Sequence, residues 1–131
     1  MSEPFALQEC EDFVSAQVAH WVAHGFGTSL AWDGDDCVAW SLLQHCIVAG
    51  GSDVEIGWTV APARWGEGIA TRMGQYALAG AASLGLDSII AYTRVDNAAS
   101  RHVMEKLGLH YEREFEHAEL PHVLYRKALA V

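Results

Sequence analysis

The chain has 131 residues, of which 51% are hydrophobic and 19% are charged, and its formal net charge is −9. This composition is typical of one folded domain spanning residues 1–131, and it excludes a disordered or low-complexity chain. The negative charge argues against a nucleic-acid partner, and the absence of a long apolar run argues against a membrane span.

The N-terminal segment predicts a single helix. Hydrophobic residues recur there at spacings of three and four, the pattern of an amphipathic helix with one buried stripe. We expect this helix over residues 7–24, ended by the glycines that follow it, with a stripe made of Leu7, Cys10, Val14, Val18 and Trp21.

Three strands are expected next. Asp33-Gly34 is a hairpin signal, because glycine adopts the positive φ of a tight turn. Further on, hydrophobic and polar residues alternate cleanly, which places Glu55 on the face opposite the hydrophobic side chains, and Pro62 ends the run. The expected strands cover about 28–32, 37–43 and 54–60.

The second half of the chain alternates between helices and strands. Gly108 stands where a left-handed helix cap belongs, and Asp96 or Asn97 can cap the start of the preceding helix. The expected order is helix 67–84, strand 88–93, helix 98–107 and a closing hairpin of strands 109–116 and 122–129. Together the elements predict an α/β or α+β fold with a mixed central sheet.

The segment between the third strand and the second helix carries the first functional signal. Gly66 and Gly68 let the backbone point successive N–H groups at an anion, next to a helix N-terminus that favours phosphate. Arg64 and Arg72 flank the turn and could add positive charge. A Walker A loop would need a lysine here, and a dinucleotide fingerprint would need Gly or Ala where Thr71 stands.

Two further motifs accompany the glycine turn in a fixed order. Glu55-Ile56-Gly57-Trp58 precedes Trp65-Gly66-Glu67-Gly68-Ile69-Ala70-Thr71, and Asn97-x-x-Ser100 then runs into Glu105-Lys106-Leu107-Gly108. Over roughly 28–129 this combination resembles the GNAT superfamily of acyl-CoA-dependent N-acyltransferases. It looks most similar to the subgroup that contains the ribosomal-protein alanine N-acetyltransferases.

The resemblance implies a site for acetyl-CoA as acyl donor. In the family, backbone N–H groups of the glycine turn hold the pyrophosphate, and the strand before it pairs with the pantetheine arm. A bulge splays this strand from the next one, and acetyl-CoA lies in the resulting V. Carried over to this sequence, the cofactor-binding residues are Trp58, Thr59, Val60, Trp65, Gly66, Gly68, Ile69, Ala70, Thr71, Asn97 and Ser100.

Acyl transfer to an amine also needs proton transfer. Glu55 is the candidate general base, acting directly or through water, although a structural carboxylate would fit the same pattern. Many family members carry a tyrosine as acid where this chain has Met104, so Ser100, four residues earlier on the same helical face, is the candidate replacement. Tyr92 and Tyr111 are alternatives.

The acceptor is less defined than the donor. Residues 1–63 hold nine acidic residues and no Lys or Arg, which favours a cationic primary amine such as a polyamine, an aminoglycoside-like amine, a Lys side chain or a peptide N-terminus. Glu112, Glu114 and Glu116 on the last hairpin could also attract it. The family usually opens with a strand and two helices, whereas one helix is expected here. The acceptor pocket could therefore be open, or completed by a homodimer.

Other functions remain open at this point. A trimmed, non-catalytic acyl-CoA-binding module would show the same motifs, and a nucleotide-binding domain of another class would show the glycine turn. His20 and His24 stand at i and i+4 and could share a metal, but no third ligand is evident and we expect none. Three cysteines and an acidic N-terminus favour a reduced, cytoplasmic protein.

Overall fold

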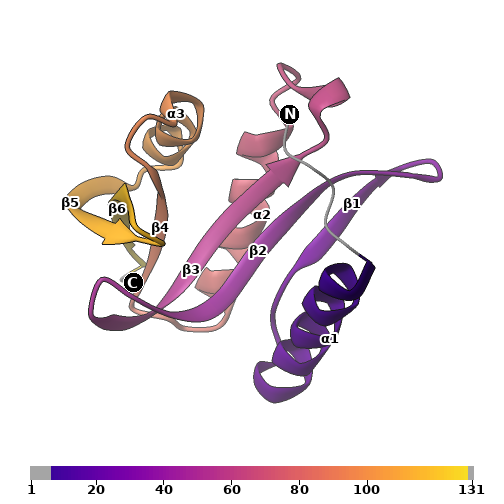
Figure 1. The fold of residues 1–131 in the computed structure, drawn as a ribbon, viewed down its shortest axis with the longest axis horizontal. Helices are drawn as coiled ribbons and strands as arrows, with labels where there is room; N and C mark the ends of the chain where they lie inside the picture. The colour runs from indigo at the N-terminus through magenta and orange to yellow at the C-terminus, as the bar shows by residue number, and fades with distance from the viewer. Residues whose placement is uncertain (1–6, 130–131) are drawn as a thin grey trace.

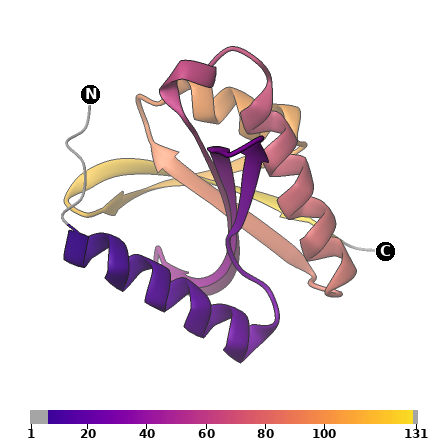
Figure 2. The ribbon, with the colours of Figure 1, turned by 90° about the vertical axis from the view of Figure 1, so that its right-hand side faces the viewer.

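One mixed sheet of six strands organises the molecule, with helices on both sides (Figures 1 and 2). The computed structural model describes residues 7–129. Its helices are α1 (Leu7–His24), α2 (Ile69–Ser83), α3 (Ala98–Lys106) and the short 3-10 helix η1 (Pro62–Arg64). Its strands are β1 (Ser29–Asp33), β2 (Asp36–Val48), β3 (Gly51–Val60), β4 (Ser88–Arg94), β5 (His110–His117) and β6 (Leu120–Ala128).

The strand order is β1-β2-β3-β4-β6-β5, and β3 with β4 is the parallel pair among antiparallel neighbours. The α+β class and the splayed parallel pair are therefore as expected from the sequence. Two strands are longer than predicted, because β2 and β3 continue to a tight turn at Ala49 and Gly50.

The main core lies between the sheet and the helices α2 and α3. Ile56, Ile89, Ala77 and Met104 are almost fully buried there, in one cluster that joins both helices to the strands. A smaller cluster with Ile90 covers the opposite face of the sheet. Because β4 is buried on both faces, its Ile89-Ile90-Ala91 segment is a continuous hydrophobic run.

Helix α1 occupies the predicted residues, but its predicted buried stripe is wrong. Val14 and Val18 are more than half exposed, and the side chains of Leu7 and Cys10 lie outside the described residues. The reason is that α1 follows β2 beyond Ser41, where β1 no longer pairs with that edge and the His45 N–H donates to Nε2 of His20 at 3.1 Å. The helix thus meets the polar edge of a strand rather than a hydrophobic face. Figure 2 shows it on the side of the sheet away from α2.

None of the helices within residues 7–129 combines the length and the hydropathy of a membrane span.

Candidate functional site

The parallel strands β3 and β4 separate soon after they meet. Their register holds one pair, Glu55 with Ile90, and beyond it the strands diverge toward their C-terminal ends (Figure 1). We call the open part, residues 57–60 of β3 facing 92–94 of β4, the fork. The register of β2 with β3 is unbroken from Val48–Gly51 to Ala39–Val60, so the bulge expected here is not formed. The fork results from divergence of β3 from β4 instead.

The glycine turn closes one side of the fork. Gly66 and Gly68 have φ of 85° and 77°, and a Cβ built at either position would meet no atom within 4 Å. These glycines therefore serve the backbone conformation and leave the space beside it open. Helix α2 begins at Ile69, two residues later than predicted, because Gly68 is its left-handed N-cap.

Among the described residues, no side chain caps the start of α2 and no acidic residue lies in its first turn. The first N–H groups of a helix have no partner within the helix, and the helix dipole adds partial positive charge there. The Trp65 indole N–H donates to the Val60 carbonyl at 2.8 Å and so ties the turn to the end of β3. The arrangement presents backbone donors to an anion at the mouth of the fork.

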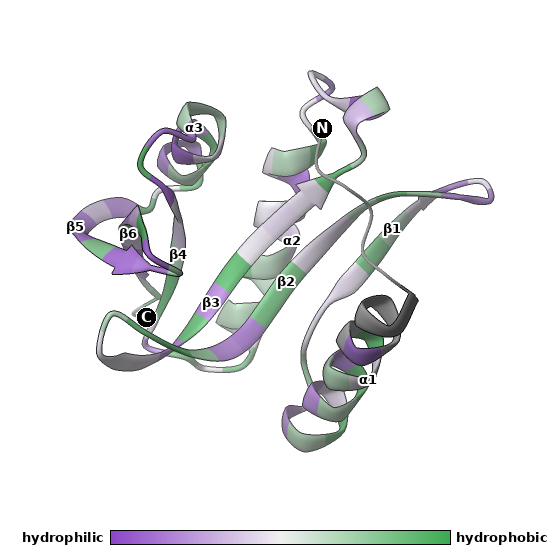
Figure 3. Ribbon diagram, in the orientation of Figure 1, coloured by the Kyte–Doolittle hydropathy of each residue, from purple (hydrophilic) through white to green (hydrophobic). Residues whose placement is uncertain are grey.

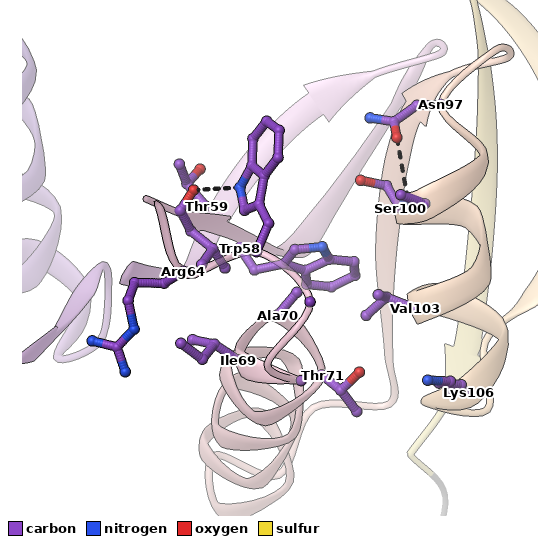
Figure 4. Close-up of a pocket in the computed structure, with 15 residues that line it drawn as sticks. Trp58, Thr59, Arg64, Ile69, Ala70, Thr71, Asn97, Ser100, Val103 and Lys106 are labelled. Carbon is purple, nitrogen blue, oxygen red and sulfur yellow. Dashed lines mark hydrogen bonds between the residues drawn. The ribbon is translucent and has the colours of Figure 1, made fainter. Parts of the chain in front are cut away.

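A pocket of about 650 Å³ lies between this turn and helix α3 (Figure 4). All of the cofactor-binding residues predicted from the sequence line it. Its lining consists of Trp58, Thr59, Val60, Arg64, Trp65, Gly66, Gly68, Ile69, Ala70, Thr71, Asn97, Ala99, Ser100, Val103 and Lys106.

The α3 side of the pocket is one helical face. Asn97, Ser100, Val103 and Lys106 follow one another at a spacing of three and all line the pocket. Val103 and Lys106 had no functional assignment from the sequence, although this spacing could have identified them. Oδ1 of Asn97 accepts from the Ser100 N–H at 3.1 Å and caps the helix (Figure 4), whereas Met104 is buried in the core.

The cations near the turn have different surroundings. Arg64 lines the pocket, but its guanidinium donates to Asp33 at 2.9 Å and to Glu67 at 2.9 Å, so its charge is already compensated. Arg72 is exposed to solvent and is not among the lining residues. Neither arginine therefore offers the pocket an uncompensated charge, and Lys106 supplies a cation from α3 instead.

Glu55 does not line this pocket. It is 5% exposed, and it lies on the face of β3 opposite the core residues Val54 and Ile56. Nε2 of Gln44, its partner across the β2–β3 hairpin, donates to Oε1 of Glu55 at 2.7 Å. The two predicted catalytic residues are therefore not brought together in this pocket: Ser100 lines it from α3, and Glu55 does not line it.

Two further groups on the Glu55 side have shifted acidity. Burial, reinforced by the Glu55 carboxylate, raises the pKa of the Cys46 thiol to about 12. Burial and a hydrogen bond with Glu55 also raise the pKa of Tyr92 on β4. Both groups are consequently neutral at pH 7. Tyr92 packs edge-on against Phe115 and His117, with ring centroids 5.8 and 5.3 Å apart.

The two histidines of α1 belong to a cluster of rings. The ring centroids of His20 and His24 are 4.5 Å apart, and His45 of β2 lies 4.3 Å from His24. Burial and the neighbouring imidazoles lower the pKa of His24. Within residues 7–129, no group of three or more His, Cys, Asp or Glu side chains has the arrangement of a metal site.

The acidic residues of the last hairpin do not act together. Glu112 binds Arg126, with Oε1 and Nε 2.8 Å apart. Glu114 and Glu116 instead line a second, shallower pocket of about 250 Å³ together with Glu119.

Known proteins share the fold that builds this site. A family model described as an acetyltransferase (GNAT) domain matches residues 1–110. A GNAT-family acetyltransferase structure from Bordetella pertussis is 21% identical, with a TM-score of 0.86, covering 95% of this chain and 78% of that one.

Two other solved structures have the same fold. A ribosomal-protein-alanine N-acetyltransferase from Brucella melitensis is 17% identical, with a TM-score of 0.77 and coverage of 95% of this chain and 79% of that one. A Salmonella typhimurium acetyltransferase solved with acetyl-CoA is 16% identical, with a TM-score of 0.79 and coverage of 92% and 73%. At these identities the likeness concerns the fold.

Proposed function

The chain belongs to the GNAT acetyltransferase family, and from this premise we propose that it transfers the acetyl group of acetyl-CoA to a primary amine. The observation that carries the proposal is the pocket between the glycine turn and α3, lined by every residue that the family motifs assign to acyl-CoA. The Salmonella relative was solved with acetyl-CoA, which supports the same donor here.

The turn and the fork suit different parts of the donor. Backbone N–H groups from Gly66 to Thr71 would hold the pyrophosphate, because they combine free donors with the dipole of α2. Residues 58–60 of β3 face the fork and would pair with the amides of the pantetheine arm as an added strand would. Both interactions use backbone groups, so most side-chain substitutions would leave these hydrogen bonds in place.

The chemistry would be direct attack. A neutral amine nitrogen bonds to the thioester carbonyl carbon, the carbon–sulfur bond breaks, and the proton leaving nitrogen passes to the Glu55 carboxylate, directly or through water. A backbone N–H near Thr59 would stabilise the oxyanion. The Ser100 hydroxyl would donate to the departing thiolate, which then takes up a proton.

The acceptor is proposed to be cationic. Residues 1–63 carry nine acidic residues and no Lys or Arg, an excess of negative charge that favours a cationic acceptor, although Arg64 and Arg126 pair with two of them. The likeness to the Brucella ribosomal-protein-alanine enzyme favours a peptide N-terminus among the candidate amines. Residues 1–131 are proposed to form one acetyltransferase domain.

The first test is calorimetric titration with acetyl-CoA, with ATP and NAD as controls. We expect selective binding of acetyl-CoA, followed by CoA thiol release with at least one amine in a panel of polyamines, lysine derivatives and peptides. Binding of ATP or NAD as tight as that of acetyl-CoA, or no binding of acetyl-CoA, would contradict the proposal. Binding without thiol release would identify a non-catalytic acyl-CoA-binding module.

The second test addresses the base. Glu55→Gln keeps the size and polarity of the side chain but removes its basicity, so we expect turnover to fall roughly 10²–10⁴-fold. Because Glu55 lies outside the pocket, the Kd for acetyl-CoA should stay unchanged. Full turnover in this variant would contradict the role of Glu55 while leaving the acetyl-CoA site intact.

A further inference from the structure

A chain of side-chain hydrogen bonds leads from helix α1 to Glu55. Oγ1 of Thr28 donates to Oε1 of Gln17 at 2.6 Å, and Nε2 of Gln17 donates to Oε1 of Gln44 at 3.2 Å. Nε2 of Gln44 then donates to Oε1 of Glu55 at 2.7 Å. The chain passes from α1 through β2 into β3, and a hydrophilic band across the adjacent strands β2 and β3 is visible in Figure 3.

The direction of this chain depends on the charge of Glu55. Each glutamine amide has one donating and one accepting end, so turning one amide forces the other to turn as well. In the observed direction Glu55 receives an N–H, which suits a carboxylate. In the reversed direction the Gln44 carbonyl oxygen would face Glu55, which suits only a protonated acid. The two directions thus correspond to the two protonation states of Glu55.

The other groups around Glu55 do not compensate its charge. Cys46 of β2 and Tyr92 of β4 hydrogen-bond to it but bring no positive charge, and both are neutral at pH 7 because burial and Glu55 itself raise their pKa values. Asp53, on the same strand, is held by Arg126 of β6, with Oδ1 and Nη1 2.8 Å apart. Arg126 also binds Glu112, so its charge is divided between two other carboxylates.

Helix α1 contributes to the site mainly through polar contacts. Gln17 and His20 are the half-buried side chains of its described part, and both bond to groups of β2. Val14, Val18 and Val22 point to solvent with exposures of 58, 57 and 83%. The orientation of Gln17 is therefore linked to how α1 lies against the sheet.

We propose that Gln17 and Gln44 are positioning residues that hold Glu55 as a carboxylate, so that helix α1 sets the pH at which the base works. This inference rests on the proposed role of Glu55 as general base. It assigns a part in acetyl transfer to a helix whose described residues contribute nothing to the lining of the 650 Å³ pocket.

The decisive variant is Gln17→Glu. The new carboxylate accepts from Thr28, as Gln17 does, but it can no longer donate to Gln44. The Gln44 amide would turn to donate to residue 17 and present its oxygen to Glu55. The acidic limb of the kcat/KM profile would move upward by about one pH unit, equivalent to about tenfold in kcat/KM on that limb.

The matched control is Gln75→Glu, which makes the same change of charge on an exposed position of α2. A second variant, Gln44→Met, removes the donor to Glu55 without adding charge and retains the length of the side chain. It should shift the acidic limb in the same direction. Thermal melts and the Kd for acetyl-CoA report whether each variant keeps its fold and its donor site.

The outcomes separate the two proposals. An upward shift in Gln17→Glu and Gln44→Met, with none in Gln75→Glu and an unchanged Kd, supports the positioning role. If both variants fold and neither shifts the acidic limb of the kcat/KM profile, while Glu55→Gln loses turnover, the positioning role is overturned. The proposed function is then unaffected. Full turnover in Glu55→Gln overturns the positioning role together with the base.

Discussion

Single residues at the glycine turn determine whether its backbone can face a ligand. Gly68 has φ of 77° and no atom within 4 Å of the position its Cβ would take, so only the backbone conformation demands glycine. A residue with a Cβ costs about 1–2 kcal/mol in this left-handed region. The cost would appear both in folding and in the direction of the N–H groups that start α2.

Gly68→Ala tests this requirement. We expect the free energy of unfolding to fall by about 1 kcal/mol in urea titrations and the Kd for acetyl-CoA to rise. Gly85→Ala is the control, because Gly85 has φ of 72° and equally open surroundings, but follows the opposite end of α2 and does not line the pocket. An equal rise of Kd in both variants would contradict a local role for Gly68.

The site is predictable from the sequence where its residues are local. The glycine turn and the α3 face each consist of neighbouring positions, so the resemblance to the GNAT motifs could assign Gly66, Thr71, Asn97 and Ser100 to one site, and all four line one pocket. The bond between Gln17 and Gln44 is not predictable in this way, because it joins residues 27 positions apart and depends on the placement of α1. Periodicity within one element does not specify that placement.

At the scale of elements, α1 shows where a helical pattern misleads. Its hydrophobic stripe predicted a buried face, yet the helix lies against a strand edge, and edges offer N–H and C=O groups rather than apolar surface. By contrast, the β2–β3 register follows from a tight turn at Ala49 and Gly50, which pairs Gln44 with Glu55. That pairing is within reach of sequence analysis once β2 and β3 are extended to the turn.

The histidine cluster makes the attachment of α1 sensitive to pH. The pKa of His24 is lowered in the folded state by burial and by His45 and His20, from an ordinary value of 6.5. The unfolded chain therefore binds this proton more tightly. The contribution of His24 to stability is present above pH 6.5 and is lost as the pH falls below that value and through the lower pKa of the folded state.

We expect the Tm of the protein to drop between about pH 7.5 and about pH 5.5, and His24→Asn to reduce that drop. Scanning calorimetry at the two pH values measures both. His102→Asn is a suitable control, because His102 is exposed on α3, away from the cluster. If His24→Asn loses as much Tm as the parent, the cluster has no part in the pH dependence.

At the scale of the whole molecule, charge is distributed unevenly along the chain. Residues 1–63 hold nine acidic residues and no Lys or Arg, while the second half is balanced. Arg64 and Arg126 of the second half pair with two of the nine, Asp33 and Asp53. Long-range attraction of this kind acts on encounter rates and is screened by salt, with a Debye length of about 10 Å at 0.1 M. It should matter for the acceptor more than for the anionic donor.

If the proposed amine acceptors are substrates, we expect kcat/KM for a polycationic amine to fall several-fold between about 0.05 and about 0.5 M salt. A zwitterionic amine should show a weaker dependence, and stopped assays of CoA release with both acceptors provide the comparison. Equal salt dependence for the two would argue against electrostatic selection of the acceptor.

The single pairing of β3 with β4 has a mechanical consequence. The sheet consists of two three-stranded halves, β1-β2-β3 and β4-β6-β5, and the residue pair Glu55 and Ile90 joins them. The length of β3 from Glu55 to Val60 is about 16 Å, at roughly 3.3 Å per residue. If one half of the sheet rotated by about 10° about the Glu55–Ile90 pair, Val60 at the open end of the fork would move by about 3 Å, and Glu55 would hardly move. Entry and exit of a long donor can thus widen the opening without displacing Glu55.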